Sequence, residues 1–158
     1  MLRFVFVGKE IMHDPFAMRP FFGYNFGDYL KHWLSLSADS SHKMPKIFHV
    51  NWFRKDSQGK FIWPGFGENV RVLEWILERT ENQDVAQDSA IGRIPKAGAL
   101  NTDGLSNVDM KELFHLTSDF LKQECDDIEK YFKEQVNKDL PEEMWTELNN
   151  LRQRSNNL

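Results

Sequence analysis

The residues best suited to chemistry lie in one aromatic, glycine-containing segment, residues 51–69. Rings on either side of a planar ligand stack on its faces, at about 1–3 kcal/mol for each nucleic-acid base. Gly65 and Gly67 would let the backbone approach such a ligand, and Asn69 offers a donor and an acceptor to the edge of a purine. The segment therefore indicates a slot for a planar ligand, lined by its five large rings: Trp52, Phe53, Phe61, Trp63 and Phe66.

The same segment also has a purely structural interpretation. A cluster of rings can pin an irregular Ω-type loop to the rest of a domain. Residue types alone leave this alternative open, because the side chains that stack on ligands are also those that pack in cores. Polar groups would separate the two interpretations, since only a binding site has to choose between guanine and adenine.

Other signatures of catalysis or metal binding are absent from the sequence. The patterns G-x-x-x-x-G-K-S/T, G-x-G-x-x-G, H-E-x-x-H and G-x-S-x-G do not occur. His13 and Asp14 precede Pro15 and are typical of a capped turn, while His49 is expected to be a packed or hydrogen-bonded histidine. Cys125 is expected to be an inert buried thiol. We therefore predict no catalytic residue and no metal ligand in this chain.

Composition fits one globular domain or a piece of a larger one. The 158 residues are 41% hydrophobic and 28% charged, which supplies enough apolar surface for a core. A net charge of −4 and a pI near 5.7 argue against a nucleic-acid binder, which needs clustered lysines and arginines. One cysteine favours a reducing compartment. No stretch reaches the roughly 18 apolar residues of a membrane span, so we expect no membrane partner.

Periodicity predicts a helix-rich α+β chain with few strands. Residues 46–52 alternate in hydrophobicity and are predicted to form a strand, whereas residues 91–105 carry Gly and Pro and are expected to be irregular coil. A lone strand cannot make a sheet, so the pattern indicates part of a larger domain. The helices are predicted at residues 23–37, from Asn69 to about 78, from Asp109, over 120–136, and from Pro141 to a frayed end beyond Arg152.

Several long motifs resemble the C-terminal part of GTP-dependent phosphoenolpyruvate carboxykinase. The resemblance implies an α+β fold, a helix-rich fragment of that family's kinase-like nucleotide-binding domain. It divides the chain into a divergent segment, residues 1–7, and a family portion, residues 8–158, with a guanine-pocket loop at 45–71 and a helical tail at 108–158. The motifs lie at residues 12–25, 45–55, 63–69, 94–96 and 127–131.

The resemblance also implies a reaction and a set of site residues. Enzymes of this family convert oxaloacetate and GTP into phosphoenolpyruvate, CO2 and GDP in gluconeogenesis, with Mn²⁺ as the metal. Their guanine lies between aromatic rings, and the matching positions here are Phe53, Phe61 and Phe66. The guanine-contact motif matches Phe66, Gly67, Glu68 and Asn69, and Asn69 resembles the residue that reads the base edge.

The family's P-loop-like motif, manganese ligands, oxaloacetate-binding arginines and reactive cysteine would lie upstream of these motifs. We therefore expect a lyase (decarboxylase) by family whose 158 residues alone are inactive. We expect a cytoplasmic monomer, with a mitochondrial form left open, whose partners are GTP, GDP, oxaloacetate and phosphoenolpyruvate. The alternative is a non-catalytic nucleotide-binding or interaction fragment. A single-stranded nucleic-acid binder is disfavoured by the acidic pI.

Overall fold

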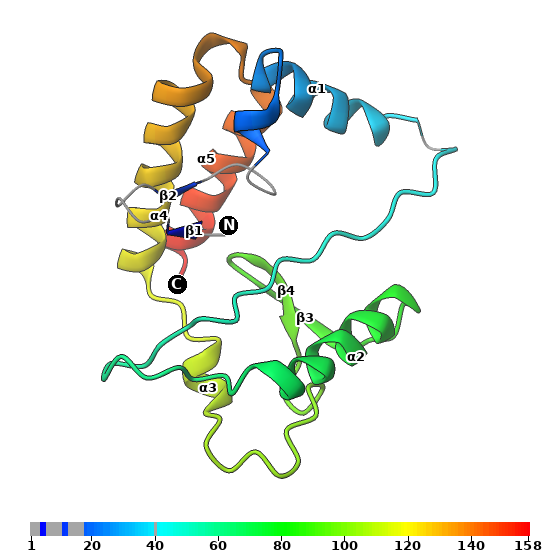
Figure 1. The fold of residues 1–158 in the computed structure, drawn as a ribbon, viewed down its shortest axis with the longest axis vertical. Coiled ribbons are helices and arrows are strands. Elements are labelled where there is room, and N and C mark those ends of the chain that lie inside the picture. The colour runs from blue at the N-terminus through cyan, green and yellow to red at the C-terminus, as the bar shows by residue number, and fades with distance from the viewer. Residues whose placement is uncertain (1–3, 6–10, 13–17, 40) are drawn as a thin grey trace. The chain divides into compact units, whose positions relative to one another are not determined.

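The computed structural model describes residues 4–5, 11–12, 18–39 and 41–158. The chain divides into two compact units, coloured along the chain in Figure 1. Unit 1 is Met1–His49 with Thr117–Leu158, and unit 2 is Val50–Leu116. Within the described residues, no helix has the length and apolar character needed to cross a membrane.

Unit 1 is built around two helices that lie side by side, α4 (Ser118–Tyr131) and α5 (Glu142–Asn156) (Figure 1). A third helix, α1 (Phe26–Leu36), begins at the cap formed by Asn25, whose side chain accepts from the backbone N–H of Gly27 at 2.6 Å. The remaining elements are short: β1 (Phe4–Val5) paired with β2 (Ile11–Met12), η2 (Arg19–Phe21), the π-helical turn η4 (Phe132–Val136) and η5 (Asn137–Asp139).

The core of unit 1 joins these three helices. Cys125 is 0% exposed within it, and burial raises the pKa of its thiol. A protonated buried thiol is a poor nucleophile, which agrees with the expected inert role. The buried members are Phe26, Leu30, Cys125, Tyr131, Phe132, Val136, Leu140 and Leu148.

Helix α5 extends further than the sequence predicts, because its last turn contacts α4. Arg152 does not fray: its guanidinium lies 3.0 Å from Asp126 Oδ1 and also pairs with Glu129. Ser155 is buried, and its carbonyl accepts from Ser118 Oγ at 2.8 Å. The expectation of fraying was wrong, since tertiary contacts stabilise a polar helix end that composition alone does not.

Unit 2 holds helix α2 (Asn69–Thr80), a β-hairpin and the short helices η3 (Phe66–Glu68) and α3 (Met110–Leu113). Strands β3 (Ala86–Ser89) and β4 (Gly92–Pro95) pair antiparallel. The hairpin corrects the prediction of coil over 91–105. Its strands are too polar to show an alternation of hydrophobic and polar residues. The turn between them favours the hairpin instead: Gly92 adopts φ +118°, and Ser89 Oγ donates to the Gly92 carbonyl at 2.6 Å.

The strand predicted at residues 46–52 is absent. The side chains of Phe48, Val50 and Trp52 are half-buried while Ile47 and His49 are exposed, so the predicted alternation persists in burial. No neighbouring strand pairs with this segment in the described part of the chain, and a strand requires a hydrogen-bonded neighbour. The helix-rich α+β class is confirmed, with its strands elsewhere than expected.

Candidate functional site

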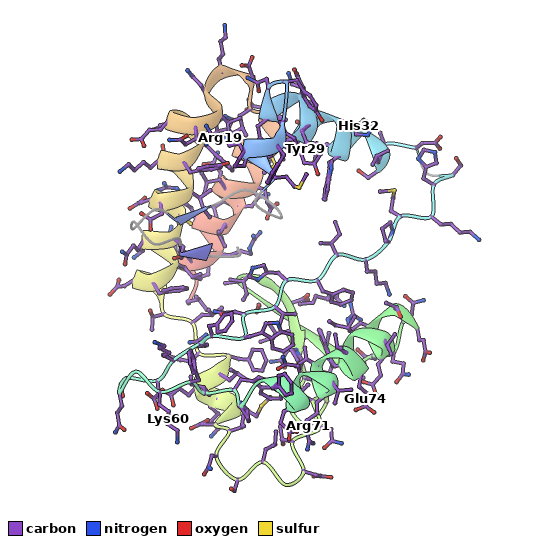
Figure 2. All side chains as sticks on the ribbon, viewed as in Figure 1. Arg19, Tyr29, His32, Lys60, Arg71 and Glu74 are labelled. Atoms are coloured by element: carbon purple, nitrogen blue, oxygen red, sulfur yellow. The ribbon has the colours of Figure 1, made fainter. Side chains whose placement is uncertain are left out.

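A tight backbone loop positions the first two rings of the aromatic segment. The N–H of Ile62 donates to the Arg54 carbonyl at 3.0 Å, and the N–H of Asp56 donates to the Lys60 carbonyl at 2.9 Å. The Asp56 carboxylate also accepts from the Lys60 N–H at 2.9 Å, a side-chain-to-backbone bond that favours such turns. Lys60 lies in this loop (Figure 2). Phe53 precedes the loop in the sequence, and Phe61 directly follows Lys60.

Phe53 and Phe61 form an exposed ring pair. Their centroids lie 6.1 Å apart with planes at 60°, an edge-to-face arrangement. Lys55 Nζ lies 5.0 Å from the centroid of Phe61, within cation–π range. Arg54, which stands between Phe53 and Lys55 in the sequence, donates to the His115 carbonyl. Burial lowers the pKa of the Arg54 guanidinium. The pair is 70% and 51% exposed for Phe53 and Phe61, so its faces remain available to a ligand.

The five rings divide between packing and exposure. Trp63 is only 3% exposed and its neighbour Ile62 is also buried, while Trp52 is half-buried. Phe66 is 97% exposed. The more buried tryptophans fit the interpretation of the segment as a structural loop, and the three exposed phenylalanines are the rings that the predicted ligand slot requires. Exposed apolar groups gathered on one ordered segment mark binding surfaces.

The turn before α2 has a constrained backbone. Gly65 has φ +77° and ψ −167°, a combination that only glycine adopts readily. Phe66 has φ +43°, which is rare for a bulky residue and costs free energy. The Gly65 carbonyl accepts from the Glu68 N–H at 3.1 Å, and the Phe66 carbonyl accepts from the Asn69 N–H. A strained backbone that presents a fully exposed ring is typical of a functional site.

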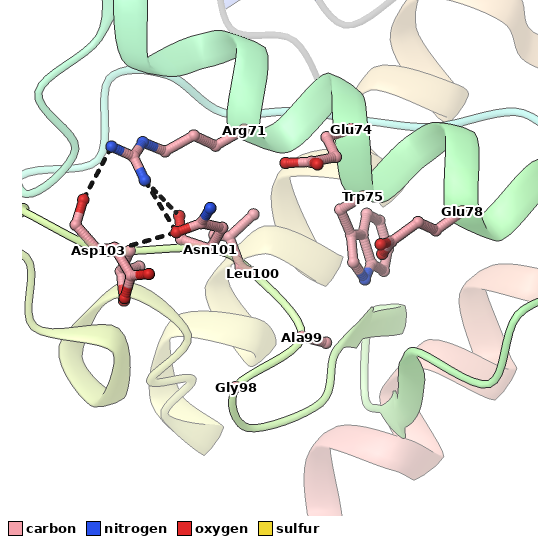
Figure 3. Close-up of a pocket in the computed structure, with 10 residues that line it drawn as sticks. Arg71, Glu74, Trp75, Glu78, Gly98, Ala99, Leu100, Asn101 and Asp103 are labelled. Carbon is pink, nitrogen blue, oxygen red and sulfur yellow. Dashed lines mark hydrogen bonds between the residues drawn. The ribbon is translucent and has the colours of Figure 1, made fainter.

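Hydrogen bonds fix the two polar residues of the motif. The indole N–H of Trp63 donates to Asn69 Oδ1 at 3.0 Å. Glu68 Oε2 accepts from Arg71 Nε at 2.6 Å, and Arg71 also donates to the carbonyls of Asn101 and Asp103 at 3.2 and 2.9 Å (Figure 3). The carboxylate of Glu68 is therefore engaged by Arg71, and the beginning of α2 is tied to residues 101–103.

A hollow of about 400 Å³ lies beside α2. Arg71 and Glu74 project from this helix in Figure 2, and Glu78 follows along the same face in Figure 3. This hollow is lined by none of the six site residues that the sequence predicts, which are Phe53, Phe61, Phe66, Gly67, Glu68 and Asn69. Its lining is largely polar and consists of Arg71, Glu74, Trp75, Glu78 and residues 98–103.

The structure thus brings together some of the predicted residues. Phe53 contacts Phe61, and Asn69 accepts a hydrogen bond from Trp63, a partner that the sequence pattern did not indicate. Phe66 makes no ring contact with another described residue. The capped turn predicted at residues 13–14 lies outside the described residues. Among those that are described, no three His, Cys, Asp or Glu side chains gather in a group that could hold a metal ion.

Two glycine substitutions should have opposite effects on stability. Gly65→Ala is expected to lower the free energy of unfolding by about 1–3 kcal/mol, because alanine is strained at this backbone conformation. Gly67 does not have a positive φ, and an added Cβ there would meet nothing within 4 Å. Gly67→Ala should therefore raise the free energy of unfolding by about 0.4–1 kcal/mol, because alanine lowers the conformational entropy of the unfolded chain. Urea unfolding of both variants checks this, and equal effects would contradict the turn geometry.

Comparison with known proteins places this chain in a family. Residues 5–154 match the family model described as the phosphoenolpyruvate carboxykinase C-terminal P-loop domain. The mitochondrial phosphoenolpyruvate carboxykinase (GTP) of Mus musculus is 60% identical over 141 residues, which cover 89% of this chain and 22% of the relative. The mitochondrial enzyme of Homo sapiens is 58% identical over 147 residues, 93% of this chain and 23% of the relative.

The cytosolic phosphoenolpyruvate carboxykinase (GTP) of Gallus gallus is equally similar, with 58% identity over 141 residues, 89% of this chain and 23% of the relative. The chain thus spans less than a quarter of the length of these curated relatives. Because the family model covers nearly all of the sequence, the chain belongs to the GTP-dependent phosphoenolpyruvate carboxykinase family and corresponds to part of its C-terminal P-loop domain.

Proposed function

We propose that this chain supplies the guanine-binding part of a phosphoenolpyruvate carboxykinase (GTP) active site. The observation that carries the proposal is the exposure of Phe53, Phe61 and Phe66 on an ordered segment beside an Asn69 amide held in one orientation. Ring faces supply affinity for any base, and the amide supplies a polar contact that depends on base identity. The membership of the family makes GTP the nucleotide expected there.

The reaction proposed for the whole protein is the conversion of oxaloacetate and GTP into phosphoenolpyruvate, CO2 and GDP, a lyase (decarboxylase) reaction that belongs to gluconeogenesis. Phosphoryl transfer depends on positioning and charge neutralisation. Binding energy from the base, which does not react, can hold the γ-phosphoryl group in line. The role proposed for this chain is the binding of the base. Mn²⁺ is proposed as the metal of the whole protein, and no residue of this chain is proposed as its ligand.

The proposed setting is the cytoplasm, with a monomer acting on small molecules. The Mus musculus and Homo sapiens enzymes named mitochondrial and the Gallus gallus enzyme named cytosolic are similar to this chain to almost the same degree, at 58–60% identity. Sequence identity therefore does not choose between the compartments, and the single cysteine fits both reducing settings.

The 158-residue chain alone is expected to form no phosphoenolpyruvate from oxaloacetate, GTP and Mn²⁺ above a blank without protein. A chimaera, in which this chain replaces the matching segment of the Mus musculus relative, is expected to form it. The reason is that the chain contributes base binding, while phosphate and metal positioning come from elsewhere in the chimaera. A coupled assay of phosphoenolpyruvate measures both. Turnover by the chain alone would contradict the proposal, and so would a folded chimaera that binds no GTP.

A second candidate is a non-catalytic interaction fragment. It is favoured by an apolar stripe on α2, where Val70, Leu73 and Leu77 are exposed at helical spacing. The chimaera separates the candidates: one that folds and binds GTP but stays inactive favours the fragment, and one that turns over favours the active site.

A further inference from the structure

The bond between Trp63 and Asn69 determines which end of the Asn69 amide is left for a ligand. An indole N–H can only donate. The Asn69 atom that faces it at 3.0 Å is therefore the carbonyl oxygen Oδ1, whichever way an isolated amide would be drawn. The amino group, Nδ2, is then the end of the amide that does not bond the indole.

The Asn69 amino group has no hydrogen-bond partner among the residues that the structure describes. Nδ2 is not among the buried polar atoms that lack a partner in the described side chains, so solvent reaches it. Asn69 itself is half-buried at the first position of α2. A fixed amide with one end satisfied inside the protein and the other end open presents a donor outward.

Guanine and adenine differ at the position that such a donor would meet. Guanine carries the acceptor O6 where adenine carries the donor N6–H2. An outward N–H2 group complements guanine O6 and opposes adenine N6. A free asparagine would not discriminate in this way, because it could rotate its amide and offer its oxygen to adenine.

We propose that Trp63 is a positioning residue that holds the Asn69 amide with its amino group outward, and thereby sets the preference for guanine over adenine. This inference rests on the proposed function and assigns one further residue to it. Trp63 suits the role because its ring is buried and cannot rotate freely. The pairing of Arg71 with Glu68, and its bonds to residues 101–103, stabilise the turn that carries Asn69.

The test compares two tryptophans of unit 2. Trp63→Phe removes the indole N–H and keeps an aromatic ring. Trp75→Phe is the matched control, because Trp75 is also buried and donates its indole N–H at 3.0 Å, but to the Val85 carbonyl. The dissociation constants of GTP and ATP are measured by titration calorimetry on the full 158-residue chain and both variants, with thermal melts alongside.

The wild-type chain is expected to bind GTP more tightly than ATP. Trp63→Phe should reduce this preference about tenfold, the value of one hydrogen bond. Trp75→Phe should lower the melting temperature and leave the preference for GTP over ATP unchanged. An unchanged preference in Trp63→Phe, or an equal loss in both variants, would overturn the role of Trp63 and leave the proposed function standing. A wild-type chain without preference for GTP would overturn the proposed function and this inference together.

A second variant keeps the test decisive if Trp63→Phe does not fold. Asn69→Asp retains an acceptor for the Trp63 indole but has no amino group to present. It is expected to melt near the wild-type temperature and to lose the preference for GTP over ATP. A folded Asn69→Asp chain with the wild-type preference would overturn the inference.

Discussion

Phe66→Ala is expected to raise the KM for GTP and for ITP by the same factor, about 5- to 150-fold, in the chimaera that carries this chain. The factor corresponds to the loss of one stacking face. Guanine and hypoxanthine both have a π-face, so the effect should not depend on the substituents of the base. Phe66 is 97% exposed, and its removal should leave the melting temperature unchanged, because the side chain stabilises nothing within the protein.

The alanine substitution also leaves the backbone strain in place. Phe66 has φ +43°, and alanine retains the Cβ that makes this conformation costly. The variant therefore removes the ring and not the strain. Phe120→Ala is the matched control, since Phe120 is an exposed phenylalanine of α4 in unit 1. A fall in stability without a change in KM would favour the interpretation of the aromatic segment as a structural loop.

The sequence predicted the elements whose cause is local. Helix α2 begins at Asn69 as expected, and α3 begins after Asp109, whose carboxylate accepts from the N–H groups of Lys111 and Glu112 at 2.8 and 3.1 Å. Caps and apolar spacing act within a few residues. Elements that depend on distant partners were predicted less well: the β3–β4 hairpin and the last turn of α5 were missed, because their stabilising contacts are not visible in local patterns.

The candidate site shows the same division. Its residue types could be found from the sequence, since aromatic rings, glycines and an asparagine stand close together at residues 51–69. Which rings are buried could not be found. Trp63 and Phe66 are both large and apolar, yet one is 3% and the other 97% exposed. The turn at Gly65, with its positive φ, lies between these two residues and separates a buried ring from an exposed one.

Asn69→Ala is expected to weaken the binding of GTP and ITP to the chimaera equally, by about 5- to 150-fold, and to leave ATP binding almost unchanged. The range corresponds to one lost partner at a buried polar group, about 1–3 kcal/mol. ITP is the informative ligand because hypoxanthine keeps the O6 acceptor of guanine and lacks its 2-amino group. Equal losses for GTP and ITP therefore place the contact at O6, and a loss for GTP alone would place it at the 2-amino group.

The same substitution should lower stability, and this effect has to be separated from recognition. Without Asn69 the buried indole N–H of Trp63 has no acceptor. Asn101→Ala is the matched control, since Asn101 Oδ1 accepts from Arg71 at 3.0 Å and from the Asp103 N–H at 3.0 Å in the same unit. It should destabilise the protein while the ratio of GTP to ATP affinity stays constant. If Asn69→Ala and Asn101→Ala change that ratio alike, or neither changes it, Asn69 does not read the base.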